Sequence, residues 1–250
     1  IAENSQFADA QNASSAGLTA TVSQTSKLQG EGEQWVITAG TLPQAHEGVA
    51  FVDELDKVEN RVQEVLATPM SSGTVIIKKA GEAKLTAETS IVSAANPEGQ
   101  SYQTVDGGCE PIDALDLPIH IQNRFDLILR VDDKVQDRDD ERETMRKIAE
   151  RKQGQYDSPM DKNTLRDYVA LAKRQEVEMT SKAQEEIIDR ILELRMDFKK
   201  SNLASIEMSG REQEKLTRLS SAIAKLRLAN KVQEQDVARA WNLMLHGLQS

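Results

Sequence analysis

"VAFVDELDKV", residues 49–58, places four mostly apolar residues directly before two adjacent carboxylates, Asp53 and Glu54. The apolar run predicts a buried strand, and open α/β sheets bind ligands at the carboxyl ends of their strands. A carboxylate pair at such an end suits Mg²⁺ at Asp53 and a water polarised by Glu54. The alternative is an acidic turn that only ends a strand. This stretch alone leaves both interpretations open.

The composition limits the class of protein. The 250 residues are 38% hydrophobic, enough for one large domain or two modest ones. The net charge of -10 argues against a surface that coats nucleic acid, although a local basic loop can still contact phosphate. Cys109 is the single cysteine, which excludes an intrachain disulfide. No apolar run approaches the roughly 20 residues of a membrane span. We expect no membrane contact and a cytoplasmic or nucleoid location, nuclear in a eukaryote.

The pattern of apolar residues predicts an α/β layer followed by a helical domain. Strands are predicted over residues 35–40, 49–53, 74–86 as a hairpin, 89–97 and 127–131. Residues 1–34 indicate weak structure and loops, and a helix from residue 58 should end or bend at Pro69. The chain after residue 162 is expected to be helical throughout. We therefore predict an α/β domain over residues 1–155 and a helical domain over residues 156–250.

Two further polar residues lie beside predicted strands. Asn96 ends the strand of residues 89–97, where its amide could orient a water near a γ-phosphate; the alternative is an Asn-Pro pair that only terminates the strand. Arg124 precedes the apolar run of residues 127–131. An arginine there could stabilise charge on a phosphoryl group in a neighbouring subunit, or it could be a surface residue.

Taken in order, the motifs carry a resemblance. They are SSAGLTATV (14–22), AGTLPQAHEGVAFVDELDKV (39–58), TVIIKKAG (74–81), TSIVSAANP (89–97), LPIHIQNRFDLI (117–128) and GREQEKLTRLSSAIAKLRL (210–228). Their sequence and spacing resemble the motor region of the minichromosome maintenance (MCM) replicative helicases, members of the AAA+ superfamily. The resemblance covers nearly the whole chain. It implies an α/β AAA+ P-loop-type core with a mainly parallel sheet, followed by a small all-helical lid.

The resemblance also implies roles for individual residues. Asp53 would bind Mg²⁺, Glu54 would be the catalytic base and Asn96 the sensor 1 residue, so that these three contact ATP. Arg124 would be an arginine finger reaching into the next subunit, and Arg211 the sensor 2 arginine of the lid. Residues 78–79, Lys78 and Lys79, would face single-stranded DNA in the central channel of a homo-hexamer that acts in DNA replication.

The sequence departs from the family pattern at two places. It contains no G-x-x-x-x-G-K-[ST], the loop that wraps phosphates with backbone N–H groups. The resemblance implies that this loop lies just upstream of residue 1, so we expect the chain alone to be inactive. Residues 67–73 read ATPMSSG where the family carries His-Glu-Ala-Met-Glu-Gln-Gln. The hypotheses are therefore an ATP-driven helicase motor, a non-catalytic ring subunit or interaction module of the same family, and another AAA+ ATPase of the chelatase type.

Overall fold

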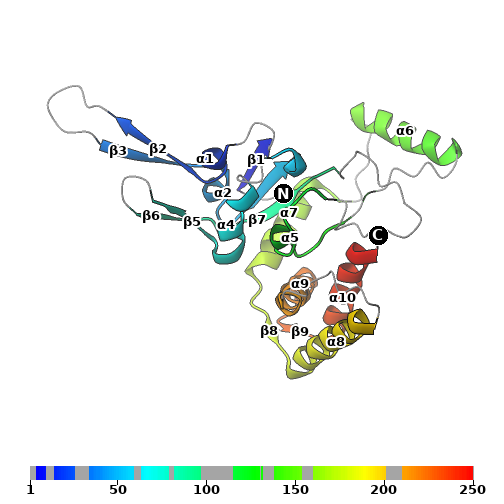
Figure 1. The fold of residues 1–250 in the computed structure, drawn as a ribbon. Coiled ribbons are helices and arrows are strands. Elements are labelled where there is room, and N and C mark those ends of the chain that lie inside the picture. The colour runs from blue at the N-terminus through cyan, green and yellow to red at the C-terminus, as the bar shows by residue number, and fades with distance from the viewer. Residues whose placement is uncertain are drawn as a thin grey trace.

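The core of the molecule is a three-stranded parallel sheet. The computed structural model describes residues 4–9, 14–25, 34–58, 63–78, 82–96, 115–129, 131, 138–153, 160–200 and 210–249. Strands β1 (Ser5–Asp9), β4 (Val49–Asp53) and β7 (Ser90–Ser93) pair in the order β1-β4-β7, as Figure 1 shows. The predicted mainly parallel sheet is thus confirmed.

The two faces of this sheet differ in their surroundings. Side chains alternate between faces along a strand, so Ala8, Ala50 and Val52 point to one side and are buried. The row formed by Phe7, Phe51 and Val92, which are register partners, lies on the other side. Their exposed fractions are 67%, 40% and 51%. Only one face of the sheet is therefore covered within the described part of the chain.

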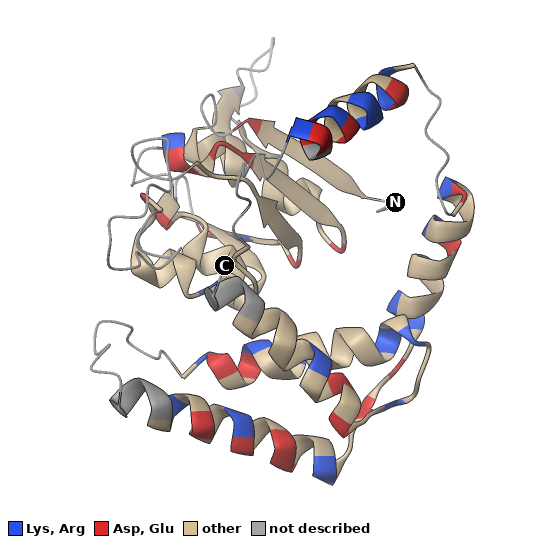
Figure 2. Cartoon of the chain, turned by 90° about the vertical axis from the view of Figure 1, so that its right-hand side faces the viewer, with Lys and Arg blue, Asp and Glu red and all other residues tan. Residues whose placement is uncertain are grey.

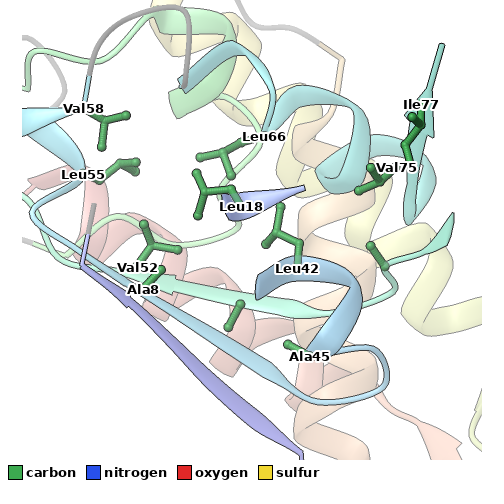
Figure 3. Close-up of a cluster of buried hydrophobic side chains, with 12 residues drawn as sticks. Ala8, Leu18, Leu42, Ala45, Val52, Leu55, Val58, Leu66, Val75 and Ile77 are labelled. Carbon is green, nitrogen blue, oxygen red and sulfur yellow. The ribbon is translucent and has the colours of Figure 1, made fainter. Parts of the chain in front are cut away.

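Short helices cover the buried face. Helix α1 (Ser15–Leu18), α2 (Thr41–Gln44) and α4 (Ala67–Ser72) lie between strands along the chain. Leu18, Leu42 and Leu66 are fully buried and pack with Val52 in the cluster drawn in Figure 3. The cluster consists mainly of aliphatic side chains, as the low aromatic content of 4% requires.

Two antiparallel hairpins project from the same side of the core (Figure 1). One pairs β2 (Ala20–Thr25) with β3 (Gln34–Ala39), and the other pairs β5 (Thr74–Ile77) with β6 (Ala83–Thr86). The hairpin predicted over residues 74–86 is confirmed, although its turn lies outside the described residues. In the first hairpin, consecutive side chains of Trp35, Val36 and Ile37 are all exposed, so that ribbon stands clear of the core.

Two predictions from the sequence were wrong, and one was met only in part. Residues 1–34 contain β1, α1 and β2, because pairing with β4 and β3 stabilises strands whose own residues are largely polar. The helix predicted from residue 58 is interrupted slightly before Pro69, since a turn at residues 65–66 follows helical residues 63–64. Pro69 lies in the first turn of the next helix, α4, where its missing N–H has no partner within the helix to lose. Residues 127–129 form no strand; they pair with none of the strands in the described sheet.

Helix α6 (Arg138–Lys152) is the charged helix between the sheet and the C-terminal helices. Ion pairs one turn apart link Glu143 to Lys147 at 2.7 Å and Arg146 to Glu150 at 3.0 Å. Figure 2 shows that both signs of charge alternate along it. Such exposed pairs add little to the stability of the helix, because water screens their charges.

The C-terminal part packs three helices around a second core. They are α8 (Ser181–Lys200), α9 (Glu212–Leu226) and α10 (Glu234–Gln249). Helix α7 (Lys162–Arg174) precedes them and contacts α9. Thr180 caps α8, since its Oγ1 accepts the N–H of Ala183. The expectation of helices alone needs correction, because β8 (Glu178–Met179) pairs with β9 (Lys231–Val232). Among the described helices, none is both long and apolar enough to cross a membrane.

A buried ion pair joins α10 to the end of α9. Asp236 has no exposed surface, and its Oδ1 and Oδ2 accept bonds from Nε and Nη2 of Arg227, each at 2.8 Å. Burial acts to raise the pKa of Asp236, but the bonds from Arg227 and from the N–H of Gln233 outweigh it and hold that pKa below its usual value. The carboxylate therefore stabilises the folded state at neutral pH.

We expect Asp236→Asn to lower the free energy of unfolding of the C-terminal helices at pH 7, because Arg227 loses its charged partner. A carboxylate with a depressed folded pKa contributes stability above its unfolded pKa and loses it as pH falls through the folded pKa. The difference between wild type and variant should thus shrink below about pH 4. Urea titrations followed by circular dichroism measure it, with exposed Asp167→Asn as control. An equal difference at pH 3 and pH 7 would contradict the assignment.

Candidate functional site

The carboxylate pair lies where the sequence predicted, at the end of β4. Asp53 is the last residue of the strand and is exposed. Its Oδ1 accepts the N–H of Glu54 at 3.0 Å. Glu54 itself has a left-handed backbone, with φ 54° and ψ 42°, and precedes the 3₁₀ turn η2 (Leu55–Lys57). Non-glycine residues pay strain for this conformation, and such residues cluster at functional sites.

The segment after β7 is tied to the segment after β4. The N–H of Leu55 donates to the carbonyl of Ala94 at 3.0 Å. The N–H of Asn96 donates to Oδ1 of Asp56 at 2.9 Å. These two bonds bring Asn96 next to the turn that holds Glu54. The structure thus places Asn96 and the turn that holds Glu54 at the same edge of the sheet.

Sequence reasoning missed two carboxylates in this region. Asp9 ends β1 and is the register partner of Asp53, so the two residues lie side by side at the same edge of the sheet. Asp56 supports Asn96 and has a side chain only 6% exposed. The signal for Asp56 was present in the quoted stretch. No signal in the sequence pointed to Asp9, because β1 itself was not predicted.

This edge of the sheet fits Mg²⁺ bound together with a nucleotide better than a metal held by protein alone. Among the described residues, no group of three or more His, Cys, Asp or Glu side chains is arranged to hold a metal ion. Mg²⁺ usually keeps several waters and takes only one or two carboxylates, with phosphate oxygens as further ligands. Exposed Asp53 meets that modest requirement.

Arg124 is held against helix α4. It follows α5 (Ile119–Gln122), and its Nε donates to the carbonyl of Ala67 at 3.2 Å and to Oγ of Ser71 at 3.0 Å. A further bond runs from its Nη1 to the carbonyl of His120. Two of these partners belong to residues 67–73, the stretch that departs from the family pattern. The altered stretch thus positions this arginine.

Arg211, from the C-terminal helices, lies close enough to Arg124 for their charges to interact. Burial lowers the pKa of Arg124, and the positive charge of Arg211 lowers it further, while Glu64 opposes both effects. Glu64 is also bonded to His120, with Oε2 and Nε2 2.9 Å apart. Two arginines from different parts of the chain thus share one region, which suits an anion such as a phosphate.

The two groups of residues lie toward opposite ends of the sheet. Arg124 lines a cavity of about 540 Å³ together with Gly48 and Ser90, which lie at the amino ends of β4 and β7. Asp53, Glu54 and Asn96 lie at the carboxyl ends. Since a strand rises about 3.3 Å per residue, the ends of β4 lie roughly 15 Å apart. The structure therefore brings together Asp53, Glu54 and Asn96 in one group and Arg124 with Arg211 in another.

The candidate DNA-binding lysines are described only in part. Lys78 is exposed and directly follows β5, near the tip of its hairpin, whereas Lys79 lies outside the described residues. The neighbouring hairpin of β2 and β3 was only half predicted, through residues 35–40. Both hairpins point the same way in Figure 1, which gives this side of the core two projecting ribbons.

Comparison with known proteins gives the family. A model of the MCM P-loop domain matches residues 1–151, and a model of the MCM AAA-lid domain matches residues 163–248. Our division after residue 155 stays a prediction. The chain is 33% identical over 254 residues to a minichromosome maintenance protein MCM of Saccharolobus solfataricus, covering 100% of this chain and 36% of that relative.

Eukaryotic relatives give similar values. The chain is 32% identical over 249 residues to a DNA replication licensing factor MCM4 of Drosophila melanogaster, covering 97% of this chain and 28% of the relative. An Arabidopsis thaliana protein of the same name is 31% identical over 250 residues. The chain thus spans only about a third of the length of these relatives. Since the matches extend over nearly all of its residues, the chain belongs to the MCM family.

Proposed function

We propose that the chain is the motor region of an ATP-dependent DNA helicase that acts as a ring in DNA replication. The observation that carries the proposal is the separation of the site residues into two groups at opposite ends of the sheet. Each copy would offer Asp53, Glu54 and Asn96 to one nucleotide, and Arg124 with Arg211 to the nucleotide of its neighbour. Head-to-tail contacts of this kind close into rings, and we propose six identical copies.

The roles in this shared site follow from the chemistry of each side chain. Asp53 would ligate Mg²⁺, which bridges phosphate oxygens and neutralises charge as the γ-phosphoryl group departs. Glu54 would orient and deprotonate the attacking water, and Asn96 would hold that water in line. Arg124 and Arg211 of the neighbouring copy would bind the oxygens on which negative charge accumulates. ATP hydrolysis then requires contact between copies.

The DNA contact is proposed for the hairpin of β5 and β6. Lys78 directly follows β5, and Lys79 is the next residue in the sequence. The net charge of the chain is -10, so the contact with phosphate must be local. One hairpin supplies little affinity. A ring of hairpins around one strand gains avidity, with binding that is largely indifferent to sequence and weakened by salt.

Replacing Lys78 and Lys79 with Ala in the intact protein is expected to abolish strand displacement, because the ring then loses its phosphate contacts. DNA-independent ATP hydrolysis should fall much less. A strand-displacement assay beside a steady-state ATPase assay measures both. The matched control is Lys84→Ala on β6, which removes an exposed lysine away from the tip.

Normal unwinding by the double variant would remove the hairpin from the mechanism. The intact wild-type protein also decides between the remaining hypotheses for this family. Unwinding that needs ATP and Mg²⁺ supports the motor, whereas assembly into rings without any nucleotide binding would support a non-catalytic ring subunit. The altered residues 67–73 motivate that second hypothesis, because they contact Arg124.

A further inference from the structure

Arg124 and Arg211 come from different parts of the chain, so their spacing depends on how the C-terminal helices sit against the sheet. Their like charges repel, as the lowered pKa of Arg124 reflects. The backbone does not fix the distance between Arg124 and Arg211, because the two residues lie far apart in the sequence. Some other contact across this junction must therefore hold the two arginines in one arrangement.

An ion pair crosses the junction next to both arginines. Arg218 donates to Oδ1 of Asp126 through Nε at 3.1 Å and through Nη2 at 2.6 Å. Asp126 lies two residues after Arg124. Arg211 is at the N-terminal end of α9, and Arg218 lies two helical turns further along. The two residues therefore share one face of the helix. Each partner of the pair is thus connected to one of the two arginines by a short piece of chain.

Lys215 lies on the same face of α9, between Arg211 and Arg218. Burial lowers its pKa. The negative charges of Glu212 and Asp126 raise it, and the positive charges of Arg218 and Arg211 lower it. Asp126 is therefore the acidic residue of the sheet domain that faces this basic stretch of α9. Its position explains how a helix carrying three cations packs beside Arg124.

A second contact marks the far side of the cavity between the two parts. Nζ of Lys173, on α7, donates to the carbonyl of Glu47 at 2.9 Å. Lys173, Glu47, Asp126 and Arg218 all line the cavity that Arg124 also lines. The contact through Lys173 uses a flexible side chain and a single bond. The pair of Asp126 and Arg218 has a guanidinium with two donors, which defines an orientation as well as a distance.

We propose that Asp126 and Arg218 are positioning residues that set Arg124 and Arg211 at the spacing needed to bind one phosphoryl group of a neighbouring copy. This inference rests on the proposed function for the identity of that anion. The pair has side chains 39% and 53% exposed, so it contributes little to stability. The ion pair contributes by fixing the spacing of the two arginines. Variants that break the pair should therefore still fold.

The test measures ATP hydrolysis by the intact protein. Arg218→Gln and Asp126→Asn should each lower kcat by about 10- to 100-fold, with a smaller change in KM, because misplaced groups lose transition-state contacts. The exchanged variant Asp126→Arg with Arg218→Asp should be more active than either single variant. The control is Arg190→Gln, which removes an arginine whose ion pairs lie within α8. Normal kcat in both single variants, or no recovery in the exchanged one, would overturn the proposal.

A distance measurement tests the ion pair of Asp126 and Arg218 independently of the proposed shared site. Spin labels at Thr68 on α4 and Ala222 on α9, both exposed, report the junction in the intact protein once Cys109 and any other native cysteine are replaced by Ser. Arg218→Gln should broaden or shift the distance distribution, and the exchanged variant should restore it. An unchanged distribution would overturn the ion pair as the contact that holds the junction. If Arg124→Ala leaves hydrolysis intact, the shared site fails, while these distances still decide the role of the pair.

Discussion

Glu54→Gln in the intact protein is expected to lower ATP hydrolysis by at least about 10²-fold, the loss typical of removing a general base. Gln keeps the size of the side chain and has no carboxylate to accept a proton from water. Binding of ATP and Mg²⁺ should persist, because Asp53 at the end of β4 remains. Steady-state ATPase rates and nucleotide titrations measure the two properties separately.

The control for Glu54→Gln is Glu82→Gln, which makes the same chemical change at an exposed position before β6. That variant should hydrolyse ATP like the wild type. An undiminished rate in Glu54→Gln would show that another group activates the water. Asp9, the register partner of Asp53, would then be the first candidate to replace.

Arg124→Ala is expected to reduce hydrolysis by about 10³-fold, the lower end of the range for arginines that stabilise phosphoryl transfer. If the arginine acts on a neighbouring copy, mixing this variant with Glu54→Gln should restore part of the activity. In a ring assembled at random from equal amounts, roughly one interface in four then carries both intact groups. ATPase rates across a series of mixing ratios measure the recovery.

Recovery in mixed rings also excludes loss of folding as the cause. Arg124 bonds to Ala67 and Ser71, so its removal disturbs α4 as well as the proposed site. A misfolded copy would contribute no intact Glu54 to its neighbour and would restore nothing. Confirmed mixed rings without any recovery would argue against a site shared between copies.

The local pattern of the sequence predicted those parts of the fold that depend on neighbouring residues. The strand of residues 49–53 follows from its apolar run. The hairpin of residues 74–86 follows from two apolar stretches around a turn. β1 and β2 were missed because the stretches SQFAD and ATVSQT are weakly hydrophobic and are stabilised by distant partners. Asp9 was missed for the same reason.

The sequence likewise predicted only part of the candidate site. The carboxyl ends of β4 and β7 bring Asp53, Glu54 and Asn96 to one edge of the sheet, as the rule for parallel strands leads us to expect. The proximity of Arg124 and Arg211 could not be derived from either local sequence, because it depends on the packing of α9 against the sheet. Their catalytic roles stay predictions.

The exposed row of Phe7, Phe51 and Val92 affects the solubility of these 250 residues as an isolated chain. Parallel sheets are normally covered on both faces, and a contiguous apolar surface in water promotes association between molecules. A preparation of the isolated chain would therefore lose colloidal stability as its concentration rises, even with every described helix and strand in place. A segment or partner that covered this row would act as a solubilising layer as well as a structural one.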